Sequence, residues 1–139
     1  MATITRFEEL DCWQTARELT RRVYTLSAGG PLAKDFGLRD QMRRAGVSVM
    51  SNIAEGFESR TRPLFIELLG RAKGSAGELR AQLFVALDAG YLTEAEFHQL
   101  RDLAEKASSQ ISRLSAYLKS MPEADRVGES LPPYEIPTF

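Results

Sequence analysis

The residues that could do chemistry are few and lie far apart in the chain. There is one cysteine, Cys12, and one histidine, His98. A nucleophile pair would need the two to meet in space, and nothing around Cys12 indicates a reactive thiol, so we expect a half-buried structural cysteine. Ala95 stands three residues before His98, where the metal sites of helical bundles carry glutamate. With no phosphate-binding loop or dinucleotide fingerprint either, we expect no catalytic residues, no metal and no cofactor.

Basic residues are the second candidate for chemistry. Between Gly37 and Arg80, eight bases outnumber five acids, whereas the whole chain has a formal net charge of −1. On helical wheels these bases do not share one face, so ordinary solvated charges remain the alternative interpretation. Repeated around an oligomeric ring, however, they would create a strong field for phosphate groups. The candidate nucleic-acid contacts are Arg39, Arg43, Arg44, Arg60, Arg62, Arg71, Lys73 and Arg80.

Four amphipathic segments must position these residues. Apolar residues recur every three or four positions, which is typical of helices, over about residues 11–27, 38–57, 61–89 and 93–119. No segment alternates with a period of two, so we expect no sheet. The connections between segments are short, which makes sequential helices antiparallel neighbours. The sequence therefore predicts an all-α fold, an antiparallel up-down-up-down four-helix bundle over residues 11–119.

Several helix ends carry local signals. Asp11 with Gln14, and Thr93 with Glu96, have the spacing of capping boxes. Gly90 is a natural C-terminal cap for the third helix. We therefore expect Asp11 to cap the first helix and Thr93 to cap the fourth.

The segments outside the bundle are of two kinds. Residues 1–10 are expected to be extended. They contain acidic residues and lack the apolar stretch of a secretory signal. No part of the chain reaches the roughly 18 consecutive apolar residues of a membrane span. We therefore expect a cytoplasmic protein. Residues 120–139 contain four prolines and cannot continue a helix. They form either a loose end or an extended arm that packs on the bundle or a neighbour; the apolar residues concerned are Leu131, Tyr134, Ile136 and Phe139.

The third predicted helix has a second, unusual face opposite its apolar stripe. This face carries three glycines. A glycine inside a helix costs about 1 kcal/mol of helix stability relative to alanine, so three of them require a compensating gain in free energy. Close approach of another backbone is the usual source of such a gain. Either both faces pack inside one bundle, or this face contacts another copy. We favour the second interpretation and predict a homo-oligomer with an interface at Ile66, Gly70, Gly74, Gly77, Ala81 and Phe84.

Polar residues line one edge of the second helix at spacings of three, four and seven. Polar groups at a core boundary must find hydrogen-bond partners. We expect a structural network that fixes helix register, with a ligand or partner contact as the alternative; its members are Gln41, Ser48, Asn52 and Glu55.

Several motifs together resemble a known family. The first helix region carries Phe7, Leu10, Trp13, Gln14, Ala16, Glu18 and Leu19, and the second carries Phe36-Gly37-Leu38, Gln41, Arg44-Ala45, Ser48 and Ser51-Asn52-Ile53-Ala54-Glu55-Gly56. Ala72, Gly74-Ser75, Glu78-Leu79 and Gly90-Tyr91-Leu92 follow. Over about residues 7–119 the chain resembles the bacterial four-helix bundle proteins first noticed as products of intervening sequences inside 23S ribosomal RNA genes. It departs from them in its long proline-containing tail.

The resemblance implies an antiparallel four-helix bundle that forms a homopentamer with a central channel. The accessory proteins of diversity-generating retroelements are similar in fold, and they bind nucleic acid and a reverse transcriptase. The family has no assigned catalytic residues, and its name reflects gene location. Our first hypothesis is therefore a non-enzymatic homo-oligomer that binds nucleic acid through repeated basic residues. The alternative is a protein-interaction scaffold with no nucleic-acid role.

Overall fold

The computed structural model describes residues 2–122 and 134–137 of the 139-residue chain. Long helices dominate it, and two short strands lie at the ends of the described chain. The elements in chain order are β1 (Ala2–Ile4), the 3-10 turn η1 (Phe7–Glu9), α1 (Asp11–Ser27), α2 (Gly30–Lys34), α3 (Phe36–Glu58), α4 (Arg62–Asp88), α5 (Glu94–Ser120) and β2 (Tyr134–Ile136).

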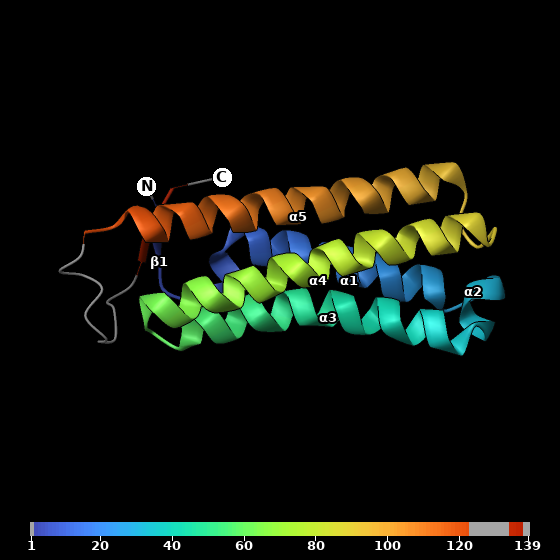
Figure 1. Ribbon diagram of the computed structural model, residues 1–139, viewed down its shortest axis with the longest axis horizontal. Helices are drawn as coiled ribbons and strands as arrows, with labels where there is room; N and C mark the ends of the chain where they lie inside the picture. Colours follow the sequence, from blue (N-terminus) through green and yellow to red (C-terminus); the bar gives the residue numbers. More distant parts are fainter. Residues whose placement is uncertain (1, 123–133, 138–139) are drawn as a thin grey trace.

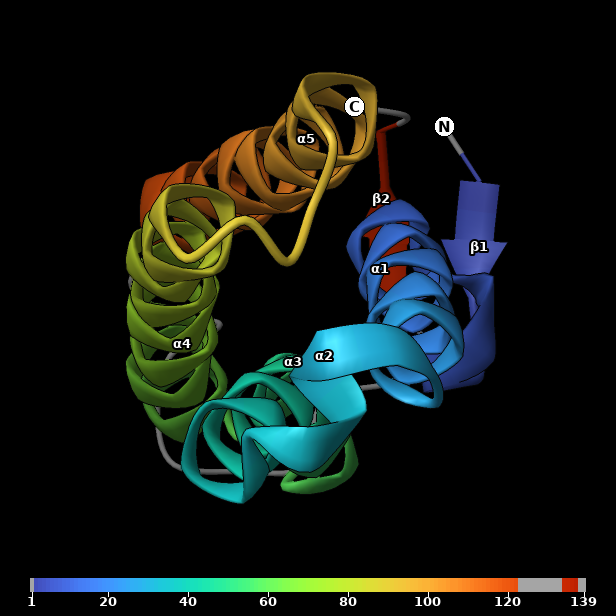
Figure 2. The same cartoon turned by 90° about the vertical axis from the view of Figure 1, so that its right-hand side faces the viewer.

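The four long helices, α1, α3, α4 and α5, form one bundle. Each runs opposite to the one before it (Figure 1). Seen down the bundle, they surround a common axis in the order α1, α3, α4, α5, so that α5 returns to lie beside α1 (Figure 2). The predicted all-α four-helix bundle is confirmed.

The core runs the length of the bundle in two clusters. Toward the strands it contains Phe57, Phe65 and Tyr134, and toward α2 it contains Leu19, Leu83 and other residues from all four helices. Each large apolar side chain buried there contributes about 1.5–3 kcal/mol. The apolar stripes of the four helices are thus buried inside the bundle. No helix in the described part of the chain is long and apolar enough to cross a membrane.

The helix ends confirm one predicted cap and correct another. Thr93 forms the expected capping box: its hydroxyl accepts from the Glu96 amide at 3.1 Å, and the Glu96 carboxylate accepts from the Thr93 amide at 2.9 Å. Asp11 is not the cap of α1. Leu10 occupies that position without a side-chain cap, because its side chain is buried in the core and Asp11 already lies inside the helix.

The connection between α1 and α3 is more structured than predicted. After Gly29 the chain forms the short helix α2, and Asp35 then caps α3 by accepting a hydrogen bond from the Leu38 amide at 3.2 Å. The Tyr91 hydroxyl donates to the same carboxyl group at 3.0 Å. Because of this cap, α3 begins at Phe36, two residues earlier than the apolar stripe indicated.

The prediction of no sheet was wrong. Strands β1 and β2 pair antiparallel, with Thr3 opposite Glu135, and three residues in each strand are too few to show a period of two. Tyr134 and Ile136 are buried, and the Tyr117 hydroxyl of α5 donates to the Glu135 carbonyl at 2.6 Å. The packed arm is therefore the correct interpretation for this part of the tail; Leu131 and Phe139 lie outside the described residues.

Candidate functional site

The outward side of α4 carries the small residues predicted to form an interface. Gly70, Gly74, Gly77 and Ala81 are all exposed, and a Cβ atom built on any of the three glycines would meet nothing within 4 Å. We call these four residues the outer strip. The interpretation that both faces of this helix pack within one bundle is therefore wrong, because the core lies on the other side of α4.

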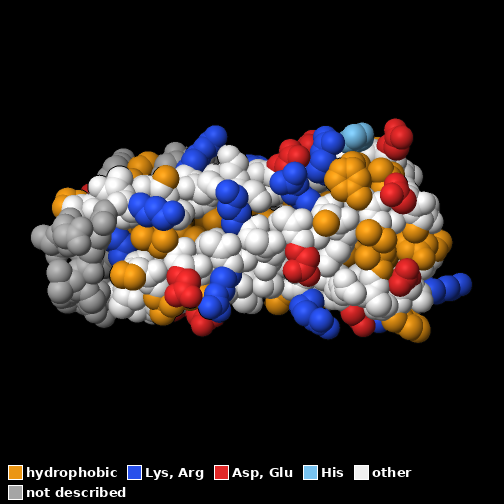
Figure 3. Space-filling view, viewed as in Figure 1, with side chains coloured by type: hydrophobic (Ala, Val, Ile, Leu, Met, Phe, Trp, Pro, Cys, Tyr) orange, Lys and Arg blue, Asp and Glu red, His pale blue; other side chains and the backbone are white. Residues whose placement is uncertain are grey.

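The apolar residues beside the outer strip differ in exposure. Phe84 is 50% exposed, although its ring packs edge-on against Phe97 with centroids 4.8 Å apart. Ile66 is half-buried and packs against the core. The prediction missed Leu64 and Val85, which are 40% and 55% exposed on the same helix. Figure 3 shows hydrophobic side chains gathered over the later part of α4, on the right of that view.

Two of the predicted basic contacts hold α3 against its neighbours. Arg39 donates to the Ala33 carbonyl at 3.1 Å and to the Asp40 carboxylate at 2.9 Å. Arg43 donates to the Ser27 hydroxyl at 2.8 Å and lies over the Tyr24 ring, 4.6 Å from its centroid. Both guanidinium groups thus already have partners within the chain.

The other six basic residues do not share one surface. Arg71 pairs with Glu67 on the same helix, and Arg80 approaches Glu105 of α5 to 3.9 Å. Arg60 lies in the turn before α4, whereas Arg62, the first residue of α4, is buried rather than exposed as a surface contact would be. Arg44 and Lys73 are exposed and form no ion pair or hydrogen bond with the described residues. The structure therefore does not bring the eight bases together: they lie on α3 and α4, whose side chains point in all directions around each axis.

One of these bases borders a groove between α4 and α5. The groove has a volume of about 250 Å³, and small side chains on both helices leave it open. Its lining carries two lysines and two serine hydroxyls and no carboxylate; the residues are Leu69, Gly70, Lys73, Ile111, Ser112, Ser115, Ala116 and Lys119. Positive charge and hydroxyl donors suit the binding of an anionic group.

The predicted polar network exists in part and extends to α4. The Asn52 amide donates to the Ser48 carbonyl at 2.8 Å and to its hydroxyl at 3.0 Å. The Ser48 hydroxyl also lies 2.8 Å from that of Ser75, which joins α3 to α4. Gln41 and Glu55 are exposed, and their side chains form no hydrogen bond with the described residues. The hydrogen-bonded members of the network thus connect two helices of the bundle.

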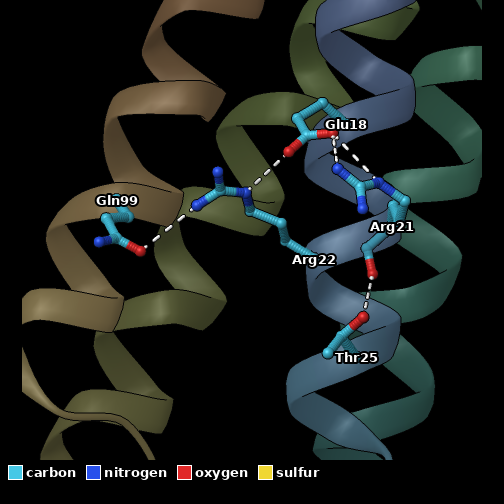
Figure 4. A network of polar contacts seen from close by, with 5 residues as sticks. All are labelled: Glu18, Arg21, Arg22, Thr25 and Gln99. Atoms are coloured by element: carbon cyan, nitrogen blue, oxygen red, sulfur yellow. Dashed lines mark hydrogen bonds and ion pairs between the residues drawn. The ribbon is translucent and has the colours of Figure 1, made fainter.

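A polar cluster between α1 and α5 was not predicted. Glu18 accepts hydrogen bonds from Arg21 and Arg22, and Arg22 also donates to Gln99 across the contact at 3.3 Å (Figure 4). The hydrogen bonds from Arg21 and Arg22 hold the pKa of the Glu18 carboxyl below its ordinary value. Spacings of three and four on α1 could have indicated the pairs, but the sequence could not place Gln99 beside them.

The side chains with chemical reactivity are separate in space. Cys12 is 2% exposed, more deeply buried than predicted, and burial raises the pKa of its thiol to about 12. The thiol therefore stays protonated at neutral pH and is a poor nucleophile. His98 is exposed near the other end of the bundle. Among the described residues, no group of three or more His, Cys, Asp or Glu side chains is placed to hold a metal ion.

Comparison with known proteins assigns the chain to a family. Residues 8–113 match the family model described as 23S rRNA-intervening sequence protein. The chain belongs to this family. The match runs from η1 into α5 and so covers the bundle, the outer strip and most of the α4–α5 groove, but not β2.

A solved structure has a similar fold. The match is to a protein of unknown function from the S23 ribosomal protein family of Bacteroides thetaiotaomicron, determined by crystallography. The two chains are 20% identical, with a TM-score of 0.68, over 75% of this chain and 97% of the other. At that identity the likeness concerns the fold alone. Comparison with curated proteins gives no significant match.

Proposed function

We propose that this intervening-sequence family member is a non-enzymatic subunit of a homo-oligomer and that the outer strip of α4 is its contact surface. The observation that carries the proposal is the exposed strip itself, with Phe84 and Val85 half-exposed beside it. An open helix surface that carries only small residues and is flanked by apolar side chains suits close approach of another helix. The family resemblance implies a pentamer.

Light scattering after size exclusion tests this proposal. We expect the wild-type mass to be several times the 15.5 kDa of one chain, and five times if the pentamer is correct. Gly74→Leu places a bulky side chain in the strip and should reduce the mass to that of one chain. Ser109→Leu adds the same side chain at an exposed position of α5 and should leave the mass unchanged. A wild-type monomer at micromolar concentration would refute the proposal.

Nucleic-acid binding is the second candidate function, and the α4–α5 groove is the observation that favours it. Lys73 and Lys119 line this groove, and Lys73, which forms no ion pair with the described residues, lies next to the outer strip. Assembly through the strip would repeat the groove around the oligomer and add the fields of its lysines. Such a repeated cationic surface suits the phosphate backbone of a nucleic acid.

A salt series of RNA and DNA binding tests this function. We expect affinity to fall steeply with salt, and Lys73→Gln to weaken binding several-fold for all sequences alike. Arg71→Gln is the matched control: it removes one charge from the same helix, but that charge is already paired with Glu67. An affinity that does not depend on salt concentration, or no binding at low salt, would contradict this function. The protein-interaction scaffold would then remain as the alternative.

A further inference from the structure

Arg62, the first residue of α4, is buried in an unusual way. Its side chain is only 2% exposed, and it is the largest of the fully buried side chains. Its Nε and Nη1 atoms have no hydrogen-bond partner, and no carboxylate of the described residues forms an ion pair with it. A buried guanidinium without a counter-charge is strongly unfavourable, because it loses its hydration and gains nothing in return.

A second buried donor lies at the same end of the core. The Tyr134 ring packs against Phe57 and Phe65, with centroids 5.3 and 5.4 Å away, and its hydroxyl is buried without a partner. Phe65 follows Arg62 by three residues on α4, so both lie on the same face of this helix. The Arg60 guanidinium lies 4.7 Å from the centroid of the Phe57 ring. Burial raises the pKa of the Tyr134 hydroxyl, and the positive charges of Arg60 and Arg62 oppose the rise.

The backbone adds further positive character at the same place. Thr61 occupies the cap position of α4 but makes no side-chain cap, and the first turn contains no acidic residue. The start of a helix carries partial positive charge and normally attracts acids. Arg60, in a left-handed conformation with φ of 58°, sets its side chain over the Phe57 ring. Two cations, a hydroxyl and a helix N-terminus thus lie at one end of the bundle, and the residues described there supply no anion to them.

We propose that the start of α4 binds a phosphate-type oxyanion, held by the Arg62 guanidinium and the Tyr134 hydroxyl in the field of Arg60. Such a group accepts several hydrogen bonds at once and would satisfy both orphaned donors. The site lies at the end of the bundle that carries both strands (Figure 1), away from the centre of the outer strip. It rests on its own residues and does not depend on the proposed assembly.

Thermal unfolding in phosphate and in chloride, at equal ionic strength, tests the site. We expect inorganic phosphate at about ten times its Kd to raise the Tm of the full chain by about 5 °C. Arg62→Met should abolish this rise, and in chloride it should unfold at the same temperature as wild type or higher, because it removes an unpaired buried charge. Arg71→Met is the control on the same helix, with an exposed and paired guanidinium, and should keep the rise.

Two further measurements keep the proposal open to refutation. Tyr134→Phe, which retains the ring, should reduce the phosphate response by about half. Oligonucleotides with and without a 5′-phosphate distinguish the free ion from the phosphate of a larger ligand: a rise only with the 5′-phosphate supports the second source. The proposal is overturned if neither probe raises the Tm of wild type more than that of Arg62→Met, or if Arg62→Met is less stable than wild type in chloride.

Discussion

Glycines on two sides of the same helix pair have opposite surroundings. Gly56 of α3 faces α4, where a Cβ atom would lie 2.9 Å from a ring carbon of Phe65 and 3.2 Å from Cβ of Leu68. Gly70, Gly74 and Gly77 of α4 face away from the bundle and would meet nothing. At Gly56, close packing of two helices offsets the helix-propensity cost of glycine, about 1 kcal/mol. On the outer strip no residue in the described part of the chain offsets this cost, and contact with another copy would supply the compensation.

The largest effect is expected where glycine already has a neighbour. Gly56→Val forces a branched side chain against Phe65 and Leu68 and should lower the free energy of unfolding by about 3 kcal/mol, measured by urea denaturation. Gly74→Val is the matched control, and in dissociated protein it should change that free energy by less than about 0.5 kcal/mol. Equal losses at the two positions would mean that the inner and outer glycines do not differ as described.

Replacing the three outer glycines should have the opposite sign. Changing Gly70, Gly74 and Gly77 together to alanine should raise the free energy of unfolding of the isolated chain by about 2–3 kcal/mol, because each change improves helix propensity without a clash. The same variant should associate more weakly, since each methyl group separates the approaching backbones. Denaturation and light scattering over a range of protein concentrations measure both effects; higher stability with unchanged association would contradict the role of the strip.

The polar contact between α3 and α4 should contribute less to the free energy of unfolding. Ser75→Ala removes the hydrogen bond between α4 and Ser48 and should cost about 1 kcal/mol in thermal unfolding. Ser51→Ala, at an exposed position of α3, makes the same chemical change and should be nearly neutral. If the two variants have the same Tm, the Ser48–Ser75 contact does not stabilise the packing of α3 on α4.

The smallest effect is expected for the hydrogen bonds that Glu18 accepts from Arg21 and Arg22 at the surface of α1. Hydrogen bonds from Arg21 and Arg22 lower the pKa of Glu18, so its charged form is favoured in the folded state. The resulting stabilisation is present above the ordinary value of 4.5 and is lost as pH falls through the lowered pKa. Wild type should therefore lose slightly more stability than Glu18→Gln between pH 6 and pH 3. Parallel pH curves for the two proteins would show that the pair contributes nothing.

The sequence predicted what depends on local pattern. Apolar periodicity located the four long helices to within a few residues, and the Thr93 capping box needs only a spacing of three. The exposure of the outer strip also followed, because positions on one helix fix each other's direction. Val85 could have been added from the same wheel, whereas Leu64 points to another side of the helix.

Features that join distant parts of the chain could not be predicted in this way. Arg62 was predicted to be a surface contact for nucleic acid, but the packing of the bundle buries its side chain. The pairing of Thr3 with Glu135 has no local signal, since each strand has only three residues. The basic residues were counted correctly, but their partners, such as Ser27 for Arg43, come from other helices.

The pairing of β1 with β2 also bears on how the protein reaches and leaves its native state. Ala2 faces Ile136, so the sheet joins positions that are almost the whole chain apart. Bringing such distant segments together is entropically costly until the helices have packed. We therefore expect the strands to pair after the transition state for folding, so that weakening them accelerates unfolding while leaving the folding rate nearly unchanged. The small sheet would then govern the kinetic lifetime of the bundle more than the speed with which it forms.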